Sequence, residues 1–134
     1  MLVIAGGAAI YVGSFIIGNS DMHLKNFSLR ETEPGNRRFQ LSNAYDMLPV
    51  NVIMPEDKEQ MALTINGKKR NIHKKEFKIL AEVCDIPANA AEKMIEKLCV
   101  LENKMLSLVD ESYLPQAQRD ELKTLIRDRV AILL

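Results

Sequence analysis

The residues best suited to chemistry lie together in one short segment, residues 18–26. Its sequence is Gly-Asn-Ser-Asp-Met-His-Leu-Lys-Asn, which places a carboxylate, an imidazole, an amine and an amide at Asp21, His23, Lys25 and Asn26. An apolar, uncharged stretch precedes the segment, and a stretch of alternating apolar and polar residues follows it. A polar loop held between two rigid elements is a common construction for a binding or catalytic site.

The spacing of Asp21 and Asn26 indicates phosphoryl transfer. In the catalytic loop of protein kinases these two residue types are separated by four positions: the Asp accepts the proton of the attacking hydroxyl, and the Asn binds Mg²⁺. A second, metal-binding carboxylate should follow a β-hairpin, and Asp46 lies at that place in the chain. Because Mg²⁺ prefers hard oxygen ligands, Asn26 and Asp46 suit it chemically.

Two alternatives stay open when the residues are considered alone. Asp21 and Asn26 are of the types that satisfy their own backbone in polar turns. A metal-dependent hydrolase could also use Asp21, His23 and Asp46, because an imidazole with carboxylates accepts zinc or manganese. His23 is equally compatible with a buried structural role.

The elements that must position this segment are predicted from hydrophobic periodicity. Residues 1–20 carry no charge and predict a buried helix ended by Gly18, rather than a membrane span or a secretory signal. Because Gly6 and Gly7 are poor helix formers, we expect residues 1–10 to be an irregular, atypical start. Alternation on both sides of residues 33–36 predicts a β-hairpin, and Asn66-Gly67 predicts a second one within residues 56–73.

Residues 74–134 are predicted to be helical. Apolar spacings of three and four residues indicate one helix up to about Asp85, a second from Pro87 with a stripe running from Met94 to Leu108, and a third after Pro115. The expected fold is therefore α+β and mostly α. It is a single domain with a catalytic and metal-binding segment at residues 11–55, two short hairpins and three C-terminal helices.

The composition narrows the function classes. A chain of 134 residues suits one domain. Eighteen basic residues balance eighteen acidic ones and Trp is absent, so neither a charge field nor an aromatic platform for direct nucleic-acid binding is expected. The basic cluster around Lys68-Lys69-Arg70 is interpreted as a solvated hairpin tip. Cys84 and Cys99 predict reduced thiols, and hence a cytoplasmic location.

Two longer motifs resemble one known family. Residues 18–29, Gly-Asn-Ser-Asp-Met-His-Leu-Lys-Asn-Phe-Ser-Leu, are similar to the Gly-Asn-x-Asp-x-His-x-Lys-Asn-Phe-Ser signature of the HipA-like toxin serine/threonine kinases. Residues 41–48, Leu-Ser-Asn-Ala-Tyr-Asp-Met-Leu, resemble the second signature of that family, in which Tyr-Asp replaces the Asp-Phe-Gly of ordinary kinases. The resemblance runs from about Tyr11 to the C-terminus and implies the C-terminal, helical lobe of a protein kinase.

The resemblance also implies roles for individual residues. Asp21 would be the catalytic base, and Asn26 and Asp46 would bind Mg²⁺. The residues expected to contact ATP, directly or through Mg²⁺, are His23, Lys25, Asn26, Tyr45 and Asp46. The implied partners are a HipB-like DNA-binding antitoxin and a protein substrate such as an aminoacyl-tRNA synthetase.

One part of a complete kinase has no counterpart in this sequence. No glycine-rich phosphate loop of an N-terminal lobe precedes residues 18–26. We therefore expect the chain alone to be inactive or weakly active, because phosphoryl transfer depends on positioning by both lobes. The alternative is a non-catalytic docking or regulatory fragment of a toxin–antitoxin system. A one-sided cleft would expose apolar surface, which makes self-association a further expectation.

Overall fold

The computed structural model describes residues 2–134, with side chains from Ile4 onward, and is mostly helical. The elements, in chain order, are α1 (Leu2–Ile17), the 3₁₀ helix η1 (Leu24–Asn26), β1 (Leu29–Glu31), β2 (Phe39–Leu41), α2 (Val50–Ile53), α3 (Lys74–Val83), α4 (Ala88–Cys99), α5 (Glu102–Asp110) and α6 (Gln116–Leu133). The α+β, mostly α prediction is confirmed.

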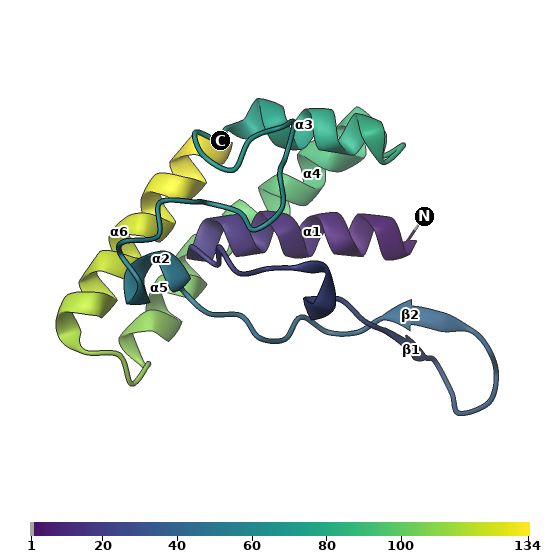
Figure 1. Cartoon of the computed structure of the whole chain (residues 1–134), viewed down its shortest axis with the longest axis horizontal. Coiled ribbons are helices and arrows are strands. Elements are labelled where there is room, and N and C mark those ends of the chain that lie inside the picture. Colours follow the sequence, from purple (N-terminus) through teal and green to yellow (C-terminus); the bar gives the residue numbers. More distant parts are fainter. Residues whose placement is uncertain (1) are drawn as a thin grey trace.

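The helices pack around α1. Helices α4 and α6 both contact α1, α3 packs on α4, and α5 packs on α6, while the β1–β2 hairpin extends away from this helical body (Figure 1). The main core forms where α1 meets the C-terminal helices. Its completely buried members include Phe15, Ile16, Ile126 and Leu133.

Helix α1 is continuous from Leu2, so the prediction of an irregular start is wrong for the described residues 2–10; Met1 lies outside them. Strand β2 contacts α1, and a Cβ on Gly6 would lie 3.1 Å from Leu41 Cδ2, whereas a Cβ on Gly7 would meet no atom within 4 Å. The helix ends as predicted at Gly18, whose φ of +74° favours glycine. Within residues 2–134, the helices are all too short or too polar to cross a membrane.

The first predicted hairpin is confirmed. Strands β1 and β2 pair antiparallel, with Leu29 opposite Leu41, although β1 begins two residues later than the alternation suggested. The Glu31 carboxylate accepts hydrogen bonds from the backbone N–H groups of Gly35 (2.7 Å) and Arg37 (3.2 Å), which fixes the loop.

The second predicted hairpin is wrong as a pair of strands. In residues 56–73 the ladder is reduced to one isolated bridge between Ile65 and Lys68. The neighbours Met61 and Ala62 are both buried, so the segment does not alternate between two faces. The backbone N–H of Ile72 donates to the Gln60 side chain instead of to a strand partner.

Four C-terminal helices are present where three were predicted. The expected second helix is divided at Val100-Leu101 into α4 and α5. The N–H of Leu101 bonds to the carbonyl of Leu98, a tight 3₁₀-type turn, and both residues at the break are exposed. The break follows from packing, because α4 packs mainly on α1 and α3 whereas α5 packs on α6.

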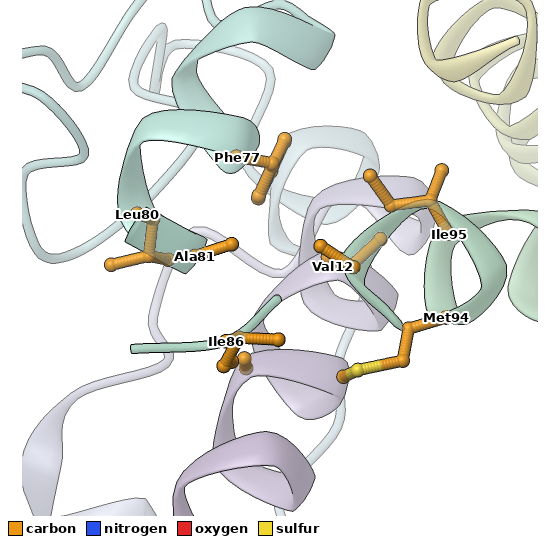
Figure 2. Close-up of a pocket in the computed structure, with 9 residues that line it drawn as sticks. Val12, Phe77, Leu80, Ala81, Ile86, Met94 and Ile95 are labelled. Atoms are coloured by element: carbon orange, nitrogen blue, oxygen red, sulfur yellow. The ribbon is translucent and has the colours of Figure 1, made fainter. Parts of the chain in front are cut away.

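A small apolar pocket of about 20 Å³ lies where α1, α3 and α4 meet. In Figure 2, the labelled side chains around it come from α1 (Val12), from α3 (Phe77, Leu80, Ala81) and from the α4 region (Ile86, Met94, Ile95). Most of the side chains that line it are apolar members of the packed core.

Two lysines of the basic cluster are paired with acidic neighbours, and the cluster does not form the tip of a two-stranded hairpin as predicted. Lys68 donates to the Glu76 carboxylate at 2.9 Å, and Lys69 lies 3.4 Å from Glu59. Glu76 is fully buried and also accepts the N–H of His73 at 2.8 Å, which caps α3. The hydrogen bond from Lys68 is the main cause that lowers the pKa of Glu76, and burial opposes it.

The lowered pKa of Glu76 predicts a pH dependence of folding. Its ionised form stabilises the folded state above the ordinary pKa of a glutamate, and this contribution is lost as the pH falls through the lower, folded-state value. We expect Glu76→Gln to lower the free energy of unfolding near neutral pH and to flatten its decline towards acid. Urea denaturation as a function of pH measures this, with the exposed Glu82→Gln on the same helix as the control. An unchanged slope in Glu76→Gln would contradict the prediction.

Candidate functional site

The site begins where α1 ends. The turn at Gly18 directs Asn19 into the interior, where it is 1% exposed. Its amide oxygen accepts the N–H of Asp21 at 3.3 Å, and its Nδ2 donates to the backbone carbonyl of Asp46 at 3.5 Å. One buried side chain therefore bridges the two segments that the sequence motifs singled out.

Asn26 and Asp46 are in direct contact. Asn26 Nδ2 donates to Asp46 Oδ2 at 2.9 Å, while its Oδ1 accepts the N–H of His23 at 3.1 Å. Asn26 is 4% exposed and is held by η1, whose capping interaction is this same bond to His23. Asp46 has a left-handed φ of +54°, a conformation that costs energy for a residue other than glycine and often occurs at functional sites.

Tyr45 and Lys25 are joined through the backbone. The Tyr45 hydroxyl donates to the carbonyl of Lys25 at 3.1 Å, which adds a third tie between the two segments. Tyr45 is 41% exposed, and the Lys25 side chain is also exposed. Both side chains therefore remain accessible to a ligand.

Asp21 and His23 lie on the surface of the same loop. Asp21 Oδ1 is 3.2 Å from His23 Nε2, and both side chains are about half exposed. Together with Ser20 they line an open pocket whose remaining members come from residues 48–69. The exposure of His23 is at odds with a buried structural role for it.

The structure therefore brings most of the predicted site together. Asn26 and Asp46 touch, Tyr45 contacts the loop, and Asp21 is connected to Asp46 through Asn19. The hydrolase alternative is not supported. Among residues 2–134, no three His, Cys, Asp or Glu side chains are gathered closely enough to hold a metal ion, and Asp21, His23 and Asp46 do not form such a group.

Three residues of the site were missed by sequence reasoning: Asn19, Asn51 and Arg129. Asn51 donates from Nδ2 to the carbonyls of Asp57 (3.3 Å) and Glu59 (2.8 Å) and so shapes the loop beside the pocket. Its backbone N–H also bonds to the carbonyl of Gly18 at 3.0 Å. Signals existed for two of them: Asn19 is a fixed position of the Gly-Asn-x-Asp signature, and Arg129 is a cation within the apolar stripe of α6.

Arg129 connects α6 to the start of the loop. Its Nη1 donates to the carbonyl of Phe15 at 2.9 Å, its Nη2 donates to Asn51 Oδ1 at 3.4 Å, and the guanidinium lies 4.5 Å from the centre of the Phe15 ring. Burial lowers the pKa of Arg129 to about 10, so the side chain stays charged at neutral pH. A cation at the C-terminal end of α1 is also favoured by the helix dipole.

The comparison with protein families agrees with this geometry. The model of the HipA-like C-terminal domain matches residues 8–105, which include both motifs and every predicted site residue. The chain therefore belongs to the family of HipA-like C-terminal domains. Residues 106–134, which include α6 and Arg129, lie outside the match. The search of curated proteins found no match.

We expect Arg129→Lys to destabilise the fold by about 1–3 kcal/mol. A single amine cannot donate to both acceptors, Phe15 O and Asn51 Oδ1, so one of them is left buried without a donor. Urea denaturation measures this loss. The matched control is Arg127→Lys, the same change at an exposed position of α6, which should shift stability by less than about 0.5 kcal/mol. Equal effects of the two changes would contradict the role assigned to Arg129.

Proposed function

We propose that this chain supplies the catalytic base and the magnesium-binding side chains of an ATP-dependent kinase that phosphorylates serine or threonine in a protein. The observation that carries the proposal is the 2.9 Å contact between Asn26 and Asp46, with Asp21 held in the same loop system through Asn19. Family membership agrees with it, because the matched region contains all these residues.

The donor set of this pair suits Mg²⁺. Asp46 uses Oδ2 for Asn26, and among the described residues its Oδ1 has no hydrogen-bond donor. Asn26 Oδ1 accepts one N–H, from His23, and a carbonyl oxygen has a second lone pair for a ligand. A carboxylate and an amide oxygen are hard ligands, and Mg²⁺ in kinases completes its coordination with phosphate oxygens and water. Bound there, the ion would neutralise the charge of the transferring phosphate.

The chemistry then divides among this chain's own residues. A substrate hydroxyl attacks the γ-phosphorus of ATP, the bond between that phosphorus and the β–γ bridging oxygen breaks, and ADP leaves. Asp21 accepts the proton that the hydroxyl loses, a role its exposed carboxylate permits. Lys25 is an accessible cation that can pair with phosphate oxygens. Asn26 and Asp46 would hold the Mg²⁺ ion that binds the ATP phosphates.

The chain alone should turn over slowly. Residues 2–17 form a helix instead of a glycine-rich loop over the phosphates, so the described residues supply one side of an ATP site. Activity then depends on a second, phosphate-covering lobe. By the same proposal the phosphoacceptor belongs to a protein such as an aminoacyl-tRNA synthetase, and a DNA-binding antitoxin restrains the kinase.

A thermal-shift titration with Mg-ATP tests the proposal. We expect the melting temperature of the chain to rise as Mg-ATP is added, since a ligand that binds only the folded state stabilises it. Asp46→Asn should weaken the apparent affinity by roughly tenfold or more, because it removes the charged metal ligand. Withdrawing Mg²⁺ with a chelator should have the same effect as the substitution.

The matched control is Asp85→Asn. Asp85 also has a left-handed φ, of +55°, but lies in the turn between α3 and α4. Its substitution should leave the Mg-ATP shift unchanged. Asp21→Asn should also retain the shift, because the proposed base is not a metal ligand. If wild-type protein showed no shift, the docking-fragment alternative would replace the kinase proposal.

A further inference from the structure

A pocket of about 450 Å³ opens beside Asp21, on the side formed by α2 and the loop that follows it. Its lining includes Leu48, Ile53, Met54, Asp57 and Glu59, but neither Asn26 nor Asp46. Asp21 therefore belongs both to the candidate catalytic loop and to a separate concave surface. Nothing in the mechanism above uses the rest of that surface.

One wall of the pocket is apolar and exposed. Leu48, Ile53 and Met54 are 50%, 45% and 49% exposed, although all three are large hydrophobic residues. Residues of this type scattered singly need no explanation, but three that line one pocket form a patch of the kind that contacts another molecule. Methionine adds adaptability to such a surface, because its side chain is unbranched and flexible.

The charged part of the lining is mainly acidic, and its carboxylates are held by hydrogen bonds and an ion pair. Asp57 accepts a hydrogen bond from Ser20 Oγ at 2.5 Å through Oδ2, and through Oδ1 it accepts the N–H of Glu59 at 3.0 Å. Glu59 is paired at 3.4 Å with Lys69, the one lysine in the lining. Together with Asp21, the pocket has three carboxylates and one ammonium group, a net negative charge when His23 is neutral.

This charge identifies the kind of occupant. Phosphate groups of a nucleotide would be repelled by Asp57 and Glu59, so ATP is disfavoured here and is better placed beside Asn26 and Asp46. A polypeptide with a basic residue is attracted by the same carboxylates. An apolar residue of the same polypeptide could contact Leu48, Ile53 and Met54, which line the same pocket.

We propose that this pocket binds the phosphoacceptor segment: an extended stretch of protein with a serine or threonine at Asp21, a lysine or arginine at Asp57 and Glu59, and an apolar residue on the α2 wall. This inference rests on the proposed kinase function, because it needs Asp21 as the base. It adds a preference for basic and apolar residues around the acceptor. In this proposal the acceptor is held by pocket residues that do not include the nucleotide-binding pair Asn26 and Asp46.

An amide ¹H–¹⁵N NMR titration of the chain, without nucleotide or Mg²⁺, tests the inference. The probes are short peptides with a central serine between one leucine and one lysine, in both orders, and the same peptides with glutamate in place of lysine. We expect the lysine peptides to shift the amide signals of Asp21, Ile53 and Glu59, with binding that weakens as salt is added. The glutamate peptides should bind at least several-fold more weakly.

Substitutions make the test specific. Glu59→Gln should weaken the binding of the lysine peptide by about 2–5-fold, the effect typical of removing one partly exposed charge. Glu56→Gln is the matched control: the same change in an exposed residue three positions away, outside the pocket lining, with little expected effect. Ile53→Asn should weaken the binding of both kinds of peptide. Val83→Asn, which also replaces an exposed β-branched residue but lies on α3 outside the pocket lining, should not.

The outcomes separate the two proposals. Equal binding of lysine and glutamate peptides, equal effects of Glu59→Gln and Glu56→Gln, no peptide binding, or signal shifts confined to other surfaces would each overturn the acceptor pocket. None of these results affects the Mg-ATP shift, which reports on Asn26 and Asp46. Conversely, peptide binding at the pocket with no Mg-ATP shift would overturn the kinase function and leave a basic-peptide docking site.

Discussion

Two buried amides hold the site together. Asn19 and Asn26 each donate to Asp46 with the nitrogen end, and each accepts a loop N–H with the oxygen end. An amide side chain can do both from two separate atoms, whereas an ionised carboxylate has no donor and an aliphatic side chain has neither donor nor acceptor. A carboxylate at position 26 would also face the Asp46 carboxylate and repel it. The two segments are thus one unit, and Asp46 keeps its unfavourable φ because both amides hold it.

This unit depends on a cation far away in the sequence. Arg129 in α6 binds the last turn of α1 and Asn51, and Asn51 in turn holds the carbonyls of Asp57 and Glu59. Burying a guanidinium without a carboxylate partner is costly, and here backbone and amide oxygens with the Phe15 ring offset the cost. A carboxylate beside Arg129 would have neutralised its charge and so weakened its favourable interaction with the C-terminal end of the α1 dipole. The arrangement makes α6, which lies outside the family match, a support for the loop.

Sequence reasoning succeeded where the signal is local. The alternation around residues 33–36 gave the first hairpin, and the periodicity of α3 and α6 placed their buried faces. It failed where contacts between elements distant in the sequence determine the local structure. Gly6 of α1 lies against β2, and the stripe from Met94 to Leu108 is broken because α4 packs mainly on α1 and α3 whereas α5 packs on α6. Neither fact can be derived from spacing within one segment.

The candidate site also has one part that the sequence predicted and one part that it did not. The motifs identified Asp21, Asn26 and Asp46, and the contact between Asn26 and Asp46 is as expected for residues that share a ligand. The supporting residues Asn19, Asn51 and Arg129 were missed, because their partners are mostly backbone carbonyls and N–H groups, which carry no sequence signal. A residue that positions another through the backbone is visible only once the chain is folded.

Asp21 lies at the boundary between two electrostatic environments, and this placement suits a base better than a metal ligand. Its N–H is held by Asn19, which also holds Asp46, while its carboxylate opens onto the acidic pocket. In phosphoryl transfer the attacking and leaving oxygens lie on opposite sides of the phosphorus, so the acceptor must approach from a side that the nucleotide does not occupy. The carboxylates of Asp57 and Glu59 make that side unfavourable for phosphate and favourable for a cationic protein segment. In the proposed reaction, charge would therefore favour ATP on one side of Asp21 and the cationic protein segment on the other.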